Sequence, residues 1–420
     1  RDDTMVILVS DNGATREGGS LGDVNWYRSA NVMPLGSIAE QIGQLDDVGG
    51  PNTAPVNATG WSMVGNTPLK RYKGNTHGGG IRDPLIISWP ARLVDHGGIR
   101  SQFCHIIDVL PTVVALAGVE VPATINGIDQ QPIEGVSLAK CVDSPTVASP
   151  KGAQYFEMHG NRGIWRDGWK AVTFHVPNTP FDNDRWELYH LDRDVGECHD
   201  VAAEHPLLVA ELVDAWWQEA RKYSVLPLDD RILERFLVSP PNPITDRRRF
   251  VYYAGAYVPT EAMPDVRNVS FEIRARLDRA PGSGDGVIAA CGDRLMGYAF
   301  YIKDGHLRFH YNAAGSHSFV RSSTDLPHGN LSVSFGFEKT GPLRGTGRLF
   351  VGGDEIAAAT IGPTIGVTFA PLGLSIGMGR ASAVANDYDG RFAFQGKLHE
   401  VVFVVGDDRG ATEIPTYMND

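Results

Sequence analysis

The sequence predicts an α/β region followed by an all-β sandwich. Up to about residue 235, apolar runs typical of strands alternate with helical patterns, as in α/β folds. Prolines and charged residues then crowd residues 236–249, which is the composition of an interdomain linker. From residue 250 onward, short alternating apolar and polar segments are separated by turn residues. We therefore expect three parts: residues 1–235, a linker at 236–249 and a β-sandwich at 250–420.

The strands and helices of the first region are predicted from local patterns. The continuous apolar run at residues 4–10 suits a buried strand of a parallel sheet, which is apolar on both faces. The other expected elements are strands at 84–89 and 186–191, a hairpin at 165–175 turning at Asp167-Gly168, and helices at 106–118 and 206–223. Residues 14–67 show little periodicity, as in a long functional loop or a disordered segment.

The composition is that of a globular protein and limits its partners. Hydrophobic residues make up 42% of the 420 residues, and charged residues make up 21%. The net charge of −12 argues against nucleic acid as a partner, because phosphate binding needs a basic surface. No apolar run is long enough to span a membrane. An anionic substrate stays compatible with the charge, since a metal ion can reverse the sign of a local site.

The four cysteines predict no metal centre of their own. Cys104, Cys141, Cys198 and Cys291 are widely spaced and form no Cys-x-x-Cys pair. Four cysteines are also too few for a disulfide scaffold in a chain of this length. We therefore expect buried thiols.

The first candidate site follows the strand at residues 4–10. Asp11 supplies a carboxylate and Asn12 an amide oxygen, and both suit a hard cation such as Ca²⁺ or Mg²⁺. Ligands of open sheets bind outside the carboxyl ends of strands, where this pair lies. The alternative is an Asx turn that only ends the strand.

The second candidate site is the loop at residues 70–84. Lys73 and neighbouring cations could bind an oxyanion. The run Gly78-Gly79-Gly80 permits a close approach of the backbone to another group. The alternative is a solvated loop with ordinary surface lysine and arginine side chains.

Together with two later segments, these sites resemble the formylglycine-dependent sulfatases, and the arylsulfatases in particular. The matching segments are Val9-Ser10-Asp11-Asn12-Gly13, Tyr72-Lys73-Gly74 with residues 79–90, residues 107–119, and residues 187–202. They follow the order of the family and cover about residues 1–225. The resemblance implies that this region is the C-terminal part of an alkaline-phosphatase-like sulfatase domain.

The resemblance implies roles for three residues. Asp11 and Asn12 match two ligands of a divalent cation, Ca²⁺ or Mg²⁺. Lys73 matches the lysine that contacts the sulfate and stabilises the leaving oxygen, which makes it both a catalytic and a substrate-binding candidate. His77 lies where the pattern departs from the family, which usually has an acidic residue before its paired glycines. No role is transferred to His77, and both an exposed loop histidine and a substrate contact stay open.

The nucleophile of the family is not found among the cysteines of this chain. It is a formylglycine made from the first residue of a Cys/Ser-x-Pro/Ala-x-Arg motif, and none of the four cysteines begins one. The chain opens at Arg1 without an initiator methionine and enters a strand at once, so we expect a truncated or processed chain. The resemblance then implies a formylglycine upstream of Arg1. On this interpretation the parent protein hydrolyses a small-molecule or glycan sulfate ester, and the fragment alone is inactive.

Alternatives stay open for both regions. The β-sandwich resembles a concanavalin-like jelly roll by its strand pattern, and either a structural role, which is favoured, or glycan binding would suit it. A phosphomonoester or phosphonate hydrolase of the alkaline-phosphatase superfamily would use the same Asp11-Asn12 corner. A non-catalytic binding module derived from a sulfatase is the non-enzymatic alternative.

Overall fold

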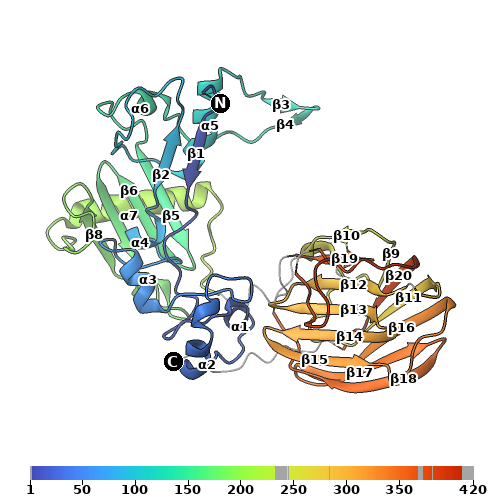
Figure 1. Ribbon diagram of the computed structural model, residues 1–420. Coiled ribbons are helices and arrows are strands. Elements are labelled where there is room, and N and C mark those ends of the chain that lie inside the picture. The colour runs from blue at the N-terminus through green and yellow to red at the C-terminus, as the bar shows by residue number, and fades with distance from the viewer. Residues whose placement is uncertain are drawn as a thin grey trace. The chain divides into compact units, whose positions relative to one another are not determined.

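The computed structural model describes residues 2–231, 244, 246–282, 284–367, 372–380 and 382–408. Its contacts divide the chain into two compact units, which are described separately. The first unit comprises residues 1–16 and 59–231, and the second comprises residues 17–58 and 232–420 (Figure 1). Among the described helices, none is both long and apolar enough to cross a membrane.

In its described residues, the first unit contains four short α-helices, one α-helix of 17 residues and three antiparallel sheets. Its helices are α3 (Thr59–Gly65), α4 (Gly78–Ile81), α5 (Val109–Ala117), α6 (Ala139–Asp143) and α7 (Pro206–Lys222). Its strands are β1 (Val6–Val9), β2 (Leu85–Ser88), β3 (Thr124–Ile125), β4 (Ile128–Asp129), β5 (Ala153–Met158), β6 (Asn161–Arg166), β7 (Trp169–Thr173) and β8 (Trp186–His190). The predicted helices at 106–118 and 206–223 are thus confirmed, the first as a 3-10 turn that continues into α5.

The first strand differs from the prediction of a buried strand in a parallel sheet. Among the described residues, β1 pairs only with β2, and the pair is antiparallel, with Val6 opposite Ser88 and Val9 opposite Leu85. Val6 and Leu8 are 56% and 63% exposed. Each strand has only the other as a hydrogen-bonded neighbour in the described part of the chain, so apolar side chains on this pair remain exposed.

The core of the first unit lies between α7 and the sheet β5-β6-β7-β8. Leu212, Trp216 and Ala220 recur at helical spacing on one face of α7 and pack against the sheet residues Ile164 and Leu188. The hairpin between β6 and β7 turns at Asp167 and Gly168, as predicted. Their φ angles of 49° and 81° are the left-handed values that a type I′ turn requires.

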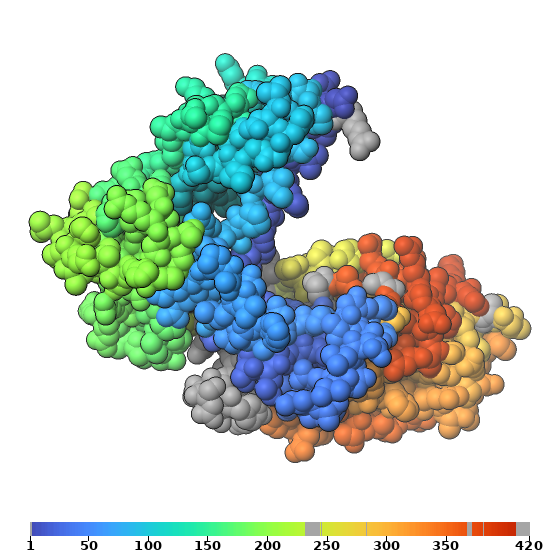
Figure 2. All heavy atoms as spheres, turned by 60° about the vertical axis from the view of Figure 1, so that its left-hand side comes forward, coloured from blue at the N-terminus to red at the C-terminus, as the bar shows by residue number. Residues whose placement is uncertain are grey.

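Residues 17–58 belong to the second unit, whereas the sequence analysis placed them with the first region. They contain the short helices α1 (Trp26–Ala30) and α2 (Ile38–Gly43). Tyr27 is buried in the main core of the β-sandwich, and the Asn31 side chain accepts a hydrogen bond from Val367 N at 3.1 Å. Figures 1 and 2 both show this blue segment against the sandwich. Local sequence patterns could not reveal this, because the partners are about 250 to 340 residues away.

In its described residues, the rest of the second unit is a sandwich of two six-stranded sheets, as predicted. The first sheet has the order β10-β19-β12-β13-β14-β15, the second has the order β18-β17-β16-β11-β20-β9, and all neighbours are antiparallel. The strands are β9 (Arg249–Tyr252), β10 (Tyr257–Val258), β11 (Phe271–Arg279), β12 (Gly286–Gly292), β13 (Gly297–Lys303), β14 (His306–Ala313), β15 (Ser316–Arg321), β16 (Gly329–Gly341), β17 (Arg344–Val351), β18 (Asp354–Ile361), β19 (Leu374–Ile376) and β20 (Lys397–Val405).

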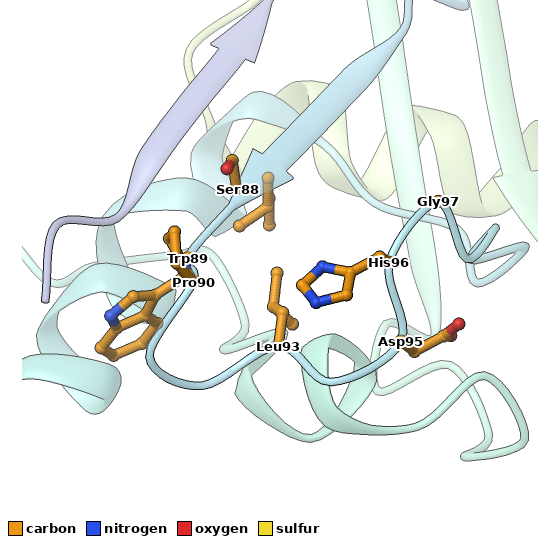
Figure 3. Close-up of a pocket in the computed structure, with 8 residues that line it drawn as sticks. Ser88, Trp89, Pro90, Leu93, Asp95, His96 and Gly97 are labelled. Carbon is orange, nitrogen blue, oxygen red and sulfur yellow. The ribbon is translucent and has the colours of Figure 1, made fainter. Parts of the chain in front are cut away.

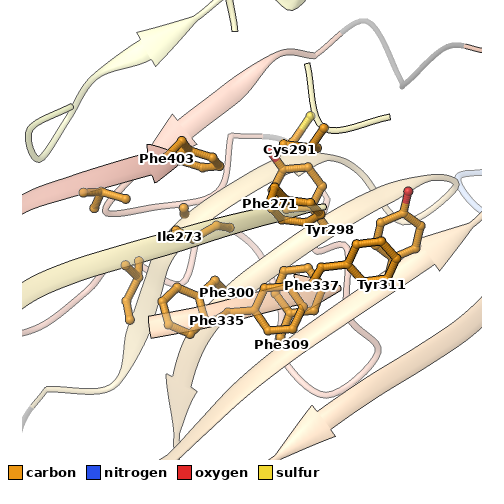
Figure 4. Packing of buried hydrophobic residues seen from close by; sticks show 14 of the residues in the cluster. Phe271, Ile273, Cys291, Tyr298, Phe300, Phe309, Tyr311, Phe335, Phe337 and Phe403 are labelled. Carbon is orange, nitrogen blue, oxygen red and sulfur yellow. The ribbon is translucent and has the colours of Figure 1, made fainter. Parts of the chain in front are cut away.

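Aromatic side chains from both sheets fill the core of the sandwich. Phe309 of β14 stacks on Phe335 of β16, with ring centroids 3.4 Å apart, and Phe271 of β11 packs nearby (Figure 4). Alternate residues of β11 are buried, which is the period-two pattern that predicted the strand. Most of the predicted linker at 236–249 lies outside the described residues, and β9 begins at Arg249.

The cysteines are all free and only partly follow the prediction. Cys141 and Cys291 are buried, and Cys104 is half-buried. Cys198 is exposed, contrary to expectation, because it lies in a surface turn where its backbone N–H donates to the Asp194 carboxylate.

We expect Tyr27→Ala to lower the unfolding free energy of the second unit by about 3 kcal/mol, as for other buried aromatic residues. The cause is the cavity left in the sandwich core. The measurement is hydrogen exchange of β12–β14 amides during urea denaturation. Leu45→Ala, on the same segment and 63% exposed, should change stability by less than about 0.5 kcal/mol. If Tyr27→Ala lowers the unfolding free energy as little as Leu45→Ala does, residues 17–58 are not part of the cooperative unit.

Candidate functional site

The Asp11-Asn12 corner lies directly after β1. Ser10 Oγ donates to the carbonyl of Asn12 at 3.1 Å, and Asn12 Nδ2 donates to the carbonyl of Gly13 at 2.9 Å. The second bond orients the Asn12 amide so that its oxygen remains available to another partner. Asp83 lies between the glycine run and β2. Burial and the neighbouring charge of Asp11 together raise the pKa of Asp83. The corner therefore gathers carboxylate and amide oxygens.

Two glycines allow this corner to pack directly on the loop at residues 70–84. An ideal Cβ at Gly13 would lie 1.8 Å from the carbonyl oxygen of Gly79. An ideal Cβ at Gly79 would lie 2.1 Å from the carbonyl oxygen of Arg71. The backbone of Gly13 also donates to the Gly80 carbonyl at 3.4 Å. No larger residue fits either position without displacing backbone, so glycine is required for this contact.

The backbone of Lys73 lies beside the Asp11-Asn12 corner, although the two are far apart in the sequence. Its N–H donates to the carbonyl of Ala14 at 3.1 Å, two residues after Asn12. Its side chain is exposed, whereas the glycines of α4 are buried. The glycine run is thus not the solvated loop of the alternative interpretation. That the side chains of Asp11, Asn12 and Lys73 share one pocket stays a prediction.

His77 is fully buried, so the interpretation as an exposed loop histidine is wrong. Its Nε2 lies 3.0 Å from Glu187 Oε2, and because a carboxylate only accepts, this nitrogen carries the proton. Lys70 Nζ and the Tyr189 hydroxyl donate to the same oxygen at 3.0 and 2.6 Å. Burial lowers the pKa of His77, and the Glu187 hydrogen bond opposes that shift only in part. Burial raises the pKa of Glu187, but the hydrogen bonds from its neighbours outweigh burial and bring it well below its usual value.

Sequence reasoning missed a buried ion pair beneath the glycine run. Glu197 Oε2 accepts from the N–H of Gly78 at 2.7 Å, and Glu197 Oε1 lies 2.6 Å from Lys170 Nζ. Both charged side chains are at most 3% exposed. Burial lowers the pKa of Lys170, and the Glu197 charge counteracts it. Glu197 therefore supplies a carboxylate to the turn that begins the glycine run. Glu197 lies in the matching segment at residues 187–202, but its local pattern does not show a partner 119 residues away in the sequence.

The chain also contains a serine form of the nucleophile motif, which the sequence analysis did not predict. Residues 88–92 read Ser-Trp-Pro-Ala-Arg, which fits Ser-x-Pro-x-Arg. Ser88 pairs with Val6, at the opposite end of the strand pair from Asp11. The three steps from Val6 to Val9 alone span about 10 Å. The geometry thus separates Ser88 from the Asp11-Asn12 corner.

A pocket of about 240 Å³ lies at the Ser88 end of β2 (Figure 3). Its lining consists of Ile87, Ser88, Trp89, Pro90, Leu93, Asp95, His96 and Gly97. None of the predicted site residues lines it, so it is separate from the Asp11-Asn12 corner and the Lys73 loop.

Comparisons with known proteins identify the first region. A family model described as Sulfatase matches residues 1–119, and one described as N-sulphoglucosamine sulphohydrolase, C-terminal, matches residues 72–222. An uncharacterized sulfatase of Schizosaccharomyces pombe is 30% identical over 240 residues, which cover 56% of this chain and 41% of that protein. Arylsulfatase A of Homo sapiens is 31% identical over 129 residues, covering 29% of this chain and 24% of that protein.

Among solved structures, one described as the crystal structure of Ps i-CgsB is similar to this chain. It is 22% identical, with a TM-score of 0.33, and the match covers 55% of this chain and 38% of that one. Through residues 1–222, the chain belongs to the sulfatase family. It spans less than half the length of the two curated relatives named above.

We expect the first unit to lose stability as the pH falls below about 6.5, partly through His77. The folded-state pKa of His77 is lowered, so below 6.5 the unfolded chain takes up a proton that the folded chain does not. One such proton costs at most about 1.4 kcal/mol per pH unit. The measurement is urea denaturation at pH 7.5, 6.5 and 5.5. The unfolding free energy should fall less steeply with decreasing pH in His77→Gln than in the parent chain. His199→Gln, at an exposed position, is the control and should follow the parent chain. An unchanged slope for His77→Gln would contradict the expectation.

Proposed function

We propose that the protein is a sulfuric ester hydrolase that uses a divalent cation, and that Asp11, Asn12 and Lys73 are the contribution of this chain to the active site. One observation carries the proposal. The backbone of the Asp11-Asn12 corner packs on the loop that bears Lys73, through the hydrogen bond from Lys73 N to Ala14 O and the contact of Gly13 with Gly79. Membership in the sulfatase family supports the reaction class.

The chemistry of the corner fits a hard cation but does not complete its coordination. Ca²⁺ takes about six to eight oxygen ligands, and Asp11 with Asn12 can offer two or three. Within the described residues, no group of three or more His, Cys, Asp or Glu side chains could hold a metal ion. We propose Ca²⁺, with Mg²⁺ as the alternative, and further ligands from outside these residues. The bound cation would polarise the sulfate oxygens as a Lewis acid.

Lys73 would act on the substrate directly. Hydrolysis of a sulfate monoester requires neutralisation of the sulfate oxygens and protonation of the leaving oxygen. The Lys73 ammonium can donate hydrogen bonds to both kinds of oxygen. The closely packed backbone around Gly13 and Gly79 limits movement of the lysine loop relative to the corner, which is the pre-organisation that electrostatic catalysis needs.

We propose that the formylglycine nucleophile comes from outside residues 1–420. None of the four cysteines begins the required motif, and Ser88, which begins its serine form, lies at the far end of the β1–β2 pair from Asp11. Covalent catalysis needs the attacking group itself, so positioning by the remaining residues cannot replace it.

For the β-sandwich we propose a structural role within a concanavalin-like jelly roll. The support is that its core encloses Tyr27 of residues 17–58, a segment that begins five residues after Asn12. A small-molecule or glycan sulfate ester is the proposed substrate class.

We expect the 420-residue chain to bind Ca²⁺ weakly, with a Kd on the order of 10⁻³ M as for incomplete oxygen sites, and to hydrolyse no aryl sulfate. Calorimetric titration measures the first property, and release of the phenol measures the second. Asp11→Ala with Asn12→Ala should abolish Ca²⁺ binding. The same double change at Asp182 and Asn183, an exposed Asp-Asn pair in the same unit, is the matched control.

Two outcomes would contradict this expectation. Submicromolar Ca²⁺ binding would mean that the ligand set is complete within the chain. Turnover that survives repurification and disappears in Lys73→Ala would mean that the nucleophile is present, and loss of that turnover in Ser88→Ala would identify it.

The natural gene product provides the direct test of the function. It should hydrolyse an aryl sulfate in preference to the matching aryl phosphate. Lys73→Ala should lower kcat/KM about 100-fold, as for loss of a general acid or a charge-stabilising donor. Lys140→Ala, an exposed lysine elsewhere in the same unit, should have no effect. Preference for the phosphate ester would replace the proposal with a phosphomonoester hydrolase.

A further inference from the structure

The side chain of Asn66, which follows α3, hydrogen-bonds to three separate backbone segments. Its Oδ1 accepts from the N–H of Ala14 at 2.9 Å. Its Nδ2 donates to the carbonyl of Arg71 at 2.9 Å and to the carbonyl of Gly79 at 2.9 Å. One planar amide thus satisfies one backbone donor and two backbone acceptors.

Each of these segments belongs to the proposed site. Ala14 is two residues after Asn12, Arg71 is two residues before Lys73, and Gly79 is the glycine whose carbonyl meets Gly13. Asn66 therefore connects the Asp11-Asn12 corner to both the lysine loop and the glycine run. The direct backbone bond from Lys73 N to Ala14 O closes the same arrangement from the other side.

The hydrogen bonds at this position require one acceptor and two donors on the same side chain, which asparagine supplies. Asn66 Oδ1 packs closely on the corner, because it would lie only 3.3 Å from an ideal Cβ at Gly13. Aspartate would keep the acceptor but would set a carboxylate oxygen against two carbonyl oxygens, and serine has a single donor. Arg71, whose carbonyl Asn66 binds, has a φ of 67°, a left-handed conformation that a non-glycine residue adopts only when its surroundings hold it.

We propose that Asn66 is the positioning residue that fixes the Asp11-Asn12 corner relative to the Lys73 loop. The effect of Asn66 on catalysis rests on the proposed function. Its effect on the backbone positions can be measured without turnover. Asn66 touches neither substrate nor cation in this scheme. It acts through the backbone of Ala14, Arg71 and Gly79.

Hydrogen exchange of the 420-residue chain tests the structural content. In Asn66→Ala, the amides of Ala14, Lys73 and Gly79 should exchange about tenfold faster, the effect of losing one hydrogen bond of ordinary strength. Amides of α7 and of the sheet β5–β8 should be unchanged. Gln102→Ala is the matched control, because it removes three hydrogen bonds from a side-chain amide to the backbone away from the site.

Asn66→Asp separates positioning from general destabilisation. It retains an acceptor for Ala14 N but loses both donors, so exchange should rise at Lys73 and Gly79 and stay low at Ala14. Unchanged protection at all three amides in either variant would overturn the proposal. If Asn66→Ala fails to fold, a uniform rise across the first unit in Asn66→Asp would overturn it as well.

Turnover by the natural gene product then separates the two proposals. We expect Asn66→Ala to lower kcat about 100-fold with KM within about threefold, the effect of a misplaced catalytic group. If Lys73→Ala lowers kcat/KM about 100-fold while Asn66→Ala leaves kcat unchanged, the function stands and the positioning role fails. If the exchange results hold but Lys73→Ala retains full turnover, the loops are coupled as described and the proposed function of the site fails.

Discussion

The direct contact of two backbone segments at Gly13 and Gly79 is the constraint on which the candidate site depends. The corner after β1 and the lysine loop approach so closely that neither glycine has room for a Cβ. Such contact excludes side chains, so its polar groups must be satisfied by the backbone itself or by one small amide, and Asn66 provides that amide. Everything proposed for Asp11, Asn12 and Lys73 follows from this packing, because it fixes residues that are about 60 positions apart in the sequence.

Buried charges hold the other side of the glycine run. Glu197 binds the N–H of Gly78 and pairs with Lys170, while His77, the residue before Gly78, binds Glu187. Removing charges from water is costly, and a buried pair often contributes little net stability. These ion pairs matter here for their geometry and not for net stability. The Glu197 and Glu187 carboxylates hold the two sides of the turn that presents the glycine run to Gly13. The same burial keeps His77 from taking up a proton as readily as a histidine in water.

The second unit is assembled from two distant parts of the chain. Residues 17–58 leave the first unit directly after the Asp11-Asn12 corner and contribute Tyr27 to the sandwich core. The sandwich is therefore incomplete without a segment that begins five residues after Asn12. The proposed structural role of the sandwich is therefore to hold residues 17–58, because loss of the sandwich core would release this segment.

The sequence by itself determined the elements whose signal is local. Period-two alternation gave the strands of the sandwich, and the helical apolar face gave α7. Asp167-Gly168 gave its hairpin turn, and the ordered motifs gave the family over residues 1–222. Only the tertiary structure decided which partners these elements take. The apolar run of β1 does not indicate its antiparallel pairing with β2, and no residue next to Asn66, Glu197 or Tyr27 in the sequence indicates what they bind. Hydrogen bonds and core contacts between distant residues depend on how the chain closes in space, which local patterns do not encode.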